Sequence, residues 1–291
     1  MKIDKNILSA LKDASILVVG ATRSSGDKIE KSILDLHKSL CFFSQIHWLI
    51  IESDSNDDTV SKLQSLANSI CNFKYKALGG LESTLPLRTQ RIAHCRNVYL
   101  DELNNNKQYN KIDYVIVADL DGVNNLLSDC SLLSCWERND WDVCTANQRG
   151  PYYDIWALRH YIWSPNDYWQ HFHFLRKHNV KTEKALFISK FSRMITIPED
   201  AEWIGVDSAF GGIAIYRKDV LKDAKYIGLT KSNEEVCEHI TLHEGIIKKG
   251  GRIFINPKFI NASYTEHTNE LLFFPGIKKR IKRYIKRTLR L

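Results

Sequence analysis

The chain has 291 residues, of which 44% are hydrophobic and 11% aromatic, enough for one large domain or two small ones with a substantial core. No stretch reaches the roughly 18 unbroken apolar residues that span a bilayer, and the charges scattered through the N-terminal residues are unlike a signal peptide. The formal charge of +7 is concentrated at the C-terminus, so the rest of the chain does not have the basic composition of a nucleic-acid-binding protein.

The first half of the sequence alternates short apolar runs with amphipathic stretches. We predict helices over residues 28–40, 58–70 and 88–103, and strands over residues 15–20, 46–52, 73–78 and 113–121. This alternation favours an α/β fold with a mostly parallel sheet that helices cover on both faces. Ligands of such sheets bind outside the carboxyl ends of the strands.

The second half is less regular and richer in aromatic residues, most densely in residues 151–174. A strand entered through a glycine pair is predicted over residues 208–217. A helix over residues 232–251 is expected to lead into a further strand at 252–257. The sequence has no internal repeat and no clear linker, so we predict a single continuous domain before the C-terminal tail.

Residues 277–291 form a strongly basic tail. They include eight Lys and Arg and no acidic residue, and without them the chain has 33 basic and 34 acidic residues. Ile277, Ile281, Ile285 and Leu289 recur every four residues, which predicts an apolar stripe on a cationic helix. This pattern is typical of a helix on an anionic membrane surface, where each Lys or Arg contributes about 1 kcal/mol. The alternatives are a stripe that packs on the protein, or RNA binding, which we do not expect.

Two carboxylates end the strand predicted over residues 113–121. Asp119 and Asp121 follow a buried apolar run, and side chains two residues apart on an extended segment share a face, about 6.6 Å apart. Such carboxylates repel each other unless a cation lies between them. Mn²⁺ or Mg²⁺ often combines one or two carboxylates with substrate phosphates. We therefore predict a metal–diphosphate site; an acidic turn at Gly122 is the alternative.

Three other motifs compete with this interpretation. Residues 20–28 resemble a phosphate loop but have five residues between the glycines instead of four. The same residues resemble a dinucleotide-binding fingerprint, but Arg23 would obstruct the approach of the pyrophosphate. His239 and His243 are spaced like zinc ligands, but Glu does not follow His239 as the metalloprotease motif requires. A dehydrogenase and a zinc hydrolase are therefore disfavoured.

Together these residues resemble the GT-A fold glycosyltransferases, which use a metal ion and a nucleotide sugar. The resemblance covers residues 14–268, and its blocks are similar in order to the capsule-associated α-1,3-mannosyltransferase type: ESDSNDDT, CRNVYLDEL, VIVADLDG, YYDIWALR, SAFGGIAIYR and CEHITLH. It implies a GT-A domain over residues 1–276, with a nucleotide-binding half at 14–125 and an acceptor-binding half at 126–276. Residues 277–291 would be a membrane-association tail.

The resemblance also implies the ligands of the metal ion. Asp121 of the D-x-D motif is expected to bind the metal directly, while Asp119 reaches the ribose or the metal through water. His267 is the expected third metal ligand, with His239 and His243 as rivals.

The resemblance further implies contacts to the nucleotide. Arg96 is expected to face the diphosphate. The remaining contacts are expected from two loops: a wall beside the base at Ala21, Thr22 and Arg23, and the base or ribose ligands Glu52 and Asp54.

Four residues of the second half are expected near the sugars. Gly211 and Gly212 would let donor sugar and acceptor approach the backbone, and Asp207 would bind a sugar hydroxyl. Glu238 would take the proton from the acceptor hydroxyl as it attacks the anomeric carbon. Glu238 favours inversion of the anomeric centre whereas the mannosyltransferase-like blocks favour retention, so the stereochemistry stays open.

Glycosyl transfer requires such a set because the departing nucleotide gains negative charge, which a divalent ion and arginine stabilise. We expect a UDP- or GDP-linked donor and a glycan or lipid-linked acceptor in surface polysaccharide synthesis. The seven cysteines form no Cys-x-x-Cys pair, so we expect a cytoplasmic protein, peripheral on the inner face of the membrane. The alternatives are a sugar nucleotidyltransferase and a non-enzymatic module that binds membrane or RNA.

Overall fold

The structure is a computed structural model, and it describes residues 5–266 and 268. The described residues form one eight-stranded sheet with the strand order β3-β2-β1-β4-β7-β5-β8-β6. The strands are β1 Ser15–Thr22, β2 Gln45–Glu52, β3 Phe73–Ala77, β4 Tyr114–Ala118, β5 Val143–Gln148, β6 Ile204–Val206, β7 Ile213–Arg217 and β8 Ile253–Ala262.

The sheet is mostly parallel, as the sequence predicts. β1 pairs in parallel with β2 and β4, β2 with β3, and β5 with β8. β7 runs antiparallel between β4 and β5, and β6 runs antiparallel to β8 at the edge. The carboxyl ends of β1, β4 and β5 therefore meet along one edge of the sheet.

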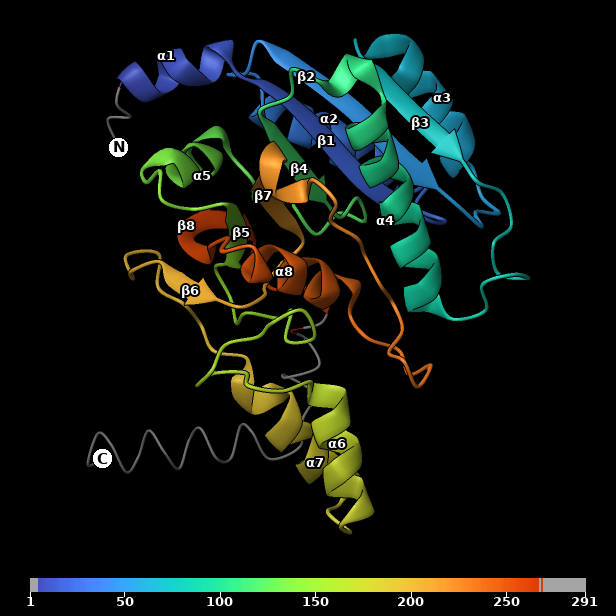
Figure 1. Cartoon of the computed structure of the whole chain (residues 1–291), viewed down its shortest axis with the longest axis vertical. Helices are drawn as coiled ribbons and strands as arrows, with labels where there is room; N and C mark the ends of the chain where they lie inside the picture. Colours follow the sequence, from blue (N-terminus) through green and yellow to red (C-terminus); the bar gives the residue numbers. More distant parts are fainter. Residues whose placement is uncertain (1–4, 267, 269–291) are drawn as a thin grey trace.

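Helices cover both faces of this sheet (Figure 1). On β1, Leu17 and Val19 pack in the core that includes α4 and α8, whereas Ile16 and Val18 pack in the core that includes α2 and α3. Strands buried on both faces read as unbroken apolar runs. The α-helices are α1 Lys5–Asp13, α2 Ile29–Ser39, α3 Thr59–Ser69, α4 Arg88–Asn105, α5 Asp129–Leu133, α6 Tyr168–Lys177, α7 Thr182–Ser189 and α8 Glu238–Lys248, and the short 3₁₀ helices are Lys107–Tyr109, Ser134–Trp136, Phe191–Arg193 and Lys218–Leu221.

The predicted elements of the first half are confirmed to within two residues, with one exception. The strand predicted over residues 113–121 ends at Ala118, so Asp119 and Asp121 lie in a loop instead of on an extended strand. The backbone N–H of Asp119 donates to the carbonyl of Gly212 at 2.9 Å, and the chain then turns at Gly122, with φ +90°. The expectation that the two carboxylates share a strand face was therefore wrong.

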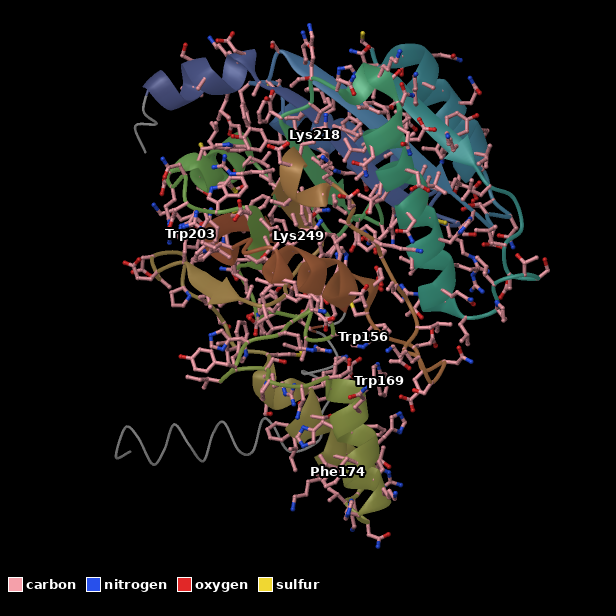
Figure 2. The ribbon with its side chains drawn as sticks, viewed as in Figure 1. Trp156, Trp169, Phe174, Trp203, Lys218 and Lys249 are labelled. Carbon is pink, nitrogen blue, oxygen red and sulfur yellow. The ribbon has the colours of Figure 1, made fainter. Side chains whose placement is uncertain are left out.

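The second half differs more from the prediction. The aromatic stretch yields part of an α6–α7 hairpin that projects from the sheet (Figure 1). Phe174 lies far out on this hairpin with 58% exposure, while Trp156 lies between the hairpin and α8 (Figure 2). The helix predicted over residues 232–251 begins only at Glu238, because Thr230 and Glu234 close a backbone turn before it. No helix of the described part of the chain has the length and apolarity to cross a membrane.

Helix α4, which belongs to the first half of the chain, contacts residues of the second half. The side chain of Asn97 donates to the carbonyl of Tyr226 and accepts from its N–H, each at 2.9 Å. Near the start of α4, the N–H and hydroxyl of Thr89 donate to Glu235 at 3.1 and 2.9 Å. These contacts hold the segment before α8 against α4, so Glu238 lies opposite Arg96.

Candidate active site

A pocket of about 510 Å³ lies at the carboxyl ends of β1 and β4, beside the first turn of α8. This is the edge at which parallel sheets bind ligands. The predicted residues that line the pocket come from four separate segments and are Ala21, Thr22, Arg23, Arg96, Asp119, Asp121 and Glu238. Folding therefore brings together residues up to about two hundred positions apart in the sequence, as the strand order requires.

Four carboxylates gather at this pocket: Asp119, Asp121, Asp154 and Glu238. Burial, together with the charges of the other three, raises the pKa of Asp119 to about 7, although Arg96 opposes the shift. The side chain of Asp119 keeps 37% exposure, so water moderates this repulsion. The excess of negative charge favours binding of a cation beside Asp119.

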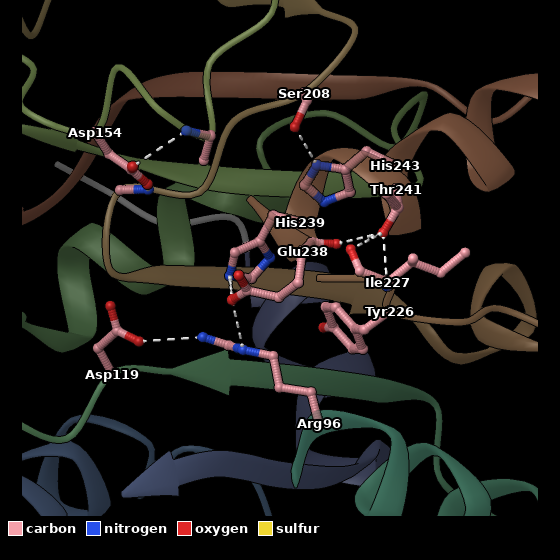
Figure 3. Close-up of polar contacts among 12 residues, drawn as sticks. Arg96, Asp119, Asp154, Ser208, Tyr226, Ile227, Glu238, His239, Thr241 and His243 are labelled. Atoms are coloured by element: carbon pink, nitrogen blue, oxygen red, sulfur yellow. Dashed lines mark hydrogen bonds and ion pairs between the residues drawn. The ribbon is translucent and has the colours of Figure 1, made fainter. Parts of the chain in front are cut away.

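Arg96 links two of these carboxylates. Its Nε lies 3.1 Å from Oε1 of Glu238, and its Nη2 lies 3.4 Å from Oδ1 of Asp119 (Figure 3). The guanidinium also lies over the rings of Phe210 and Tyr226, at 5.4 and 5.6 Å from their centroids. Arg96 is buried, and this ion pairing and ring packing hold it in place beside the D-x-D motif.

The loop that carries the D-x-D motif is held by side-chain amides. Nδ2 of Asn124 donates to the carbonyls of Asp119 and Gly212 at 2.8 and 3.1 Å, and Nδ2 of Asn261 donates to Oδ1 of Asn124 at 2.7 Å. Oδ1 of Asp121 accepts from the N–H of Val123 at 3.2 Å. The backbone of the motif is therefore fixed before any ligand binds.

The carboxylates of the pocket suit a hard divalent cation whose coordination a phosphate would complete. Within the described residues no three His, Cys, Asp or Glu side chains are grouped closely enough to hold a metal by themselves. Mg²⁺ and Mn²⁺ do not require three protein ligands, because one or two carboxylates with substrate phosphates suffice. The carboxylate oxygens of Asp119 and Asp121 have the donor chemistry for this role. His267, the expected third ligand, lies outside the described residues.

His239 and His243, the alternatives to His267 as the third metal ligand, differ in their surroundings. His243 is fully buried, and its Nδ1 and Nε2 are bonded to the hydroxyls of Ser208 and Tyr216 at 2.8 and 2.9 Å. Burial lowers its pKa to about 3. Both nitrogens are engaged, so His243 has a structural role. His239 lines the pocket.

Several predicted residues do not line the pocket. Oε1 of Glu52 accepts from the N–H of Ser55, and Oδ1 of Asp54 accepts from the N–H of Glu82, both at 2.9 Å. These carboxylates hold the loops that follow β2 and β3. Asp207 is exposed, and its N–H donates to the carbonyl of Arg159 at 2.9 Å, so the pocket does not support it as a sugar ligand.

The glycine pair before β7 also has a different role from the one expected. Both residues have positive φ, +72° at Gly211 and +93° at Gly212. A Cβ at Gly212 would lie 2.8 Å from the hydroxyl of Tyr153 and 2.9 Å from Val123. These glycines therefore allow close packing of the protein against itself behind the pocket.

The pocket includes further residues that were not predicted as site residues. Asp154 belongs to the YYDIWALR block, where a single acidic residue among aromatic ones was the available signal; its Oδ2 accepts from the N–H of Gly211 at 2.9 Å. Most of the others carry no recognisable spacing, because they come from α4 and from the irregular second half. They include Arg88, Arg91, Trp156, Tyr168, Lys190 and Phe210.

Comparison with known proteins gives matches among solved structures. No protein-family model matches the sequence, and no curated protein matches it. The fold is similar to that of the mannosyltransferase PcManGT from Pyrobaculum calidifontis, solved in complex with GDP-Man and Mn²⁺, with a TM-score of 0.50 and 13% identity over 86% of this chain and 56% of that one. S. aureus TarS 1-349 with UDP-GlcNAc gives a TM-score of 0.48 and 15% identity, over 88% of this chain and 60% of that one.

Glucosyl-3-phosphoglycerate synthase from Mycobacterium tuberculosis with UDP gives a TM-score of 0.44 and 12% identity, over 93% of this chain and 79% of that one. The chain thus spans less than two thirds of the mannosyltransferase and of the TarS fragment. At 13% identity the similarity to the mannosyltransferase concerns the fold, and it confirms the α/β fold of the GT-A class that the sequence predicts.

Proposed function

We propose that the protein is a metal-dependent glycosyltransferase that moves a sugar from a nucleoside-diphosphate sugar to a hydroxyl group. The observation that supports this most directly is the cluster of Asp121, Asp154 and Glu238 around Asp119 in a pocket at the carboxyl edge of the sheet, where Arg96 pairs with Asp119 and Glu238. A surplus of carboxylates needs a cation, and a divalent cation at such a site recruits a diphosphate. The GT-A class of fold agrees with this activity.

The geometry suggests a role for each part of the pocket. Mn²⁺ or Mg²⁺ held by Asp119 and Asp121, with His267 as the proposed third ligand, would neutralise the charge that develops on the departing diphosphate. Arg96 lies beside Asp119, where its guanidinium favours the same charge. Ala21, Thr22 and Arg23 form the wall for the nucleotide. Glu238 is oriented by Arg96 at the pocket wall and would receive the proton of the acceptor hydroxyl.

We extend the proposal to the biological setting. The donor would be UDP- or GDP-linked, and the acceptor a glycan or lipid-linked glycan in surface polysaccharide synthesis, as the resemblance to the capsule-associated mannosyltransferase type suggests. The basic residues 277–291, which lie outside the described residues, would hold the enzyme on the inner face of the membrane.

A thermal-shift panel tests the proposed activity. UDP, GDP and their sugar conjugates are added with and without Mn²⁺, and we expect at least one pair to raise the melting temperature only when the metal is present. Asp121→Ala should remove this metal-dependent gain. Asp219→Ala is the matched control, because this exposed aspartate follows β7 at the opposite edge of the sheet and should leave the gain intact.

Absence of stabilisation by every nucleotide with Mn²⁺ would refute the proposal. Production of a sugar nucleotide with release of pyrophosphate, instead of sugar transfer, would identify a nucleotidyltransferase.

A further inference from the structure

His239 is a buried histidine without a hydrogen-bond partner. It is the second residue of α8, its exposure is 3%, and it lines the pocket. Its ring stacks on Phe210 with 3.9 Å between the centroids. Neither ring nitrogen has a hydrogen-bond partner among the residues that the structure describes. The neighbouring carboxylate oxygen Oε1 of Glu238 is 3.9 Å from Nε2, too far for a hydrogen bond (Figure 3).

His243 shows that the fold can satisfy a buried imidazole on the same helix. One turn further along α8, both of its nitrogens are bonded to the hydroxyls of Ser208 and Tyr216. Most buried polar groups in proteins are paired, and an unpaired one destabilises the fold. The unpaired nitrogens of His239 lie at the pocket, which indicates that a ligand supplies their partner.

The surroundings of His239 indicate the chemistry of that ligand. Burial, and then the charge of Arg96, lower the pKa of His239 well below its ordinary value, so the ring is neutral near pH 7. A neutral imidazole offers one N–H donor and one lone pair. A hydroxyl group can satisfy either nitrogen because it both donates and accepts. The neighbouring Arg96 and Glu238 place the ring next to the region proposed for the diphosphate and the reacting carbon.

We propose that His239, supported by Phe210, forms a subsite for the donor sugar and hydrogen-bonds one of its hydroxyl groups. This inference rests on the proposed function. It assigns the carbohydrate part of the donor to a position that the nucleotide and metal contacts leave open. His239 would therefore contribute to the recognition of the sugar and not to the binding of the nucleotide.

Replacing His239 by phenylalanine tests the subsite. The variant keeps an aromatic ring against Phe210 but removes both nitrogens. Affinities are measured by calorimetry with Mn²⁺ for UDP against UDP-glucose and UDP-GlcNAc, and for GDP against GDP-mannose, using the pair that stabilises the wild type. We expect the variant to bind the nucleoside diphosphate within about twofold of the wild type and to bind the nucleotide sugar about tenfold more weakly.

A second measurement does not depend on any ligand. Because the nitrogens of His239 are unpaired in the free protein, His239→Phe should not lower its melting temperature. His243→Gln is the matched control, since it disturbs satisfied hydrogen bonds and should lower the melting temperature while keeping the preference for the sugar conjugate. If the Phe variant does not fold, His239→Leu replaces it in both measurements.

Two results would overturn the inference while leaving the proposed function in place. One is an unchanged difference in affinity between nucleoside diphosphate and nucleotide sugar in the His239 variant. The other is a loss of stability in the ligand-free variant as large as that of the His243 control, which would mean that the nitrogens have a partner within the protein. Failure of the wild type to bind any nucleotide would instead remove the proposed function itself.

Discussion

Buried charged side chains determine the character of the pocket at the scale of single residues. Arg96 lies between Asp119 and Glu238 and against two aromatic rings. Removing one member of a buried ion pair destabilises a protein by about 3–5 kcal/mol, because the other charge is left unpaired. The contacts that prepare this pocket for a ligand are therefore also needed for the fold, and variants there must be checked for stability.

His243 should make stability depend on pH. Burial keeps it neutral in the folded protein, with a pKa of about 3, whereas the unfolded chain binds a proton below about pH 6.5. Between these values the unfolded state holds more protons, so the free energy of unfolding falls by about 1.4 kcal/mol for each unit that the pH decreases. We predict that His243→Gln reduces the slope of the free energy of unfolding against pH by up to about 1.4 kcal/mol per pH unit between about pH 6 and 4. Urea unfolding at several pH values measures this slope.

The comparison of the variant with the wild type isolates this effect. Asp119 acts in the opposite direction, because its raised pKa makes the folded state bind the extra proton between about pH 4 and 7. Asp119 is present in both proteins, so its contribution cancels. An identical slope in the two proteins would show that His243 is not the buried neutral group that we describe.

At the scale of elements, the position of Glu238 depends on the contact between α4 and the segment that precedes α8. Gly228 lies where this segment crosses the start of α4, and a Cβ there would be 2.1 Å from the carbonyl oxygen of Thr89. Only glycine permits this approach. By contrast, a Cβ at Gly245 on α8 would meet nothing within 4 Å.

Alanine substitution at these two glycines should have opposite effects. Gly228→Ala is expected to lower the free energy of unfolding by about 1–3 kcal/mol, because the segment must move away from α4. Gly245→Ala is expected to raise it by about 0.5–1 kcal/mol, because alanine is the better helix former. Chemical denaturation of both variants provides the measurement. Equal stability of the two variants would contradict the close contact at Thr89.

At the scale of the whole molecule, charge is distributed unevenly. Residues 277–291 contribute eight basic side chains, whereas the rest of the chain is close to neutral. The proposed attraction to an anionic surface would therefore depend on the tail, while the proposed nucleotide binding would depend on the pocket at the sheet edge.

We predict that a variant ending at residue 276 loses binding to vesicles that contain anionic lipid but keeps metal-dependent nucleotide binding. Vesicle sedimentation measures the first property and thermal shift the second. Vesicles of phosphatidylcholine alone are the control, and wild-type binding should weaken as salt increases. Undiminished sedimentation of the truncated protein with anionic vesicles would show that another surface contacts the membrane.

The candidate site was predictable where a residue directly follows or begins a strongly patterned element. Arg23 follows β1, Asp119 and Asp121 follow β4, and Glu238 begins α8; each lines the pocket. Asp54 was placed less well, because its side-chain direction depends on a left-handed backbone, with φ +58°, that no periodicity encodes.

Residues of irregular segments were not predictable for the same reason. Asp154 lies in a segment that has no regular element, and its position depends on a hydrogen bond to Gly211, 57 residues further along the chain. The hydrogen-bond partners of His243 also come from distant segments, whereas both ring nitrogens of His239 are unpaired within the described residues, so the equal spacing of the two histidines on α8 does not reveal their different surroundings.

Local patterning was sufficient for the class of fold, the order of the first strands and helices, and the edge of the sheet at which the pocket lies. Apolar periodicity records which side of each segment is buried, and parallel strands place their carboxyl ends together. The antiparallel insertion of β7, the ion pairs of Arg96 and the unpaired nitrogens of His239 required the three-dimensional arrangement. Such features arise from contacts between segments far apart in the chain, and these contacts leave no periodic trace in the sequence.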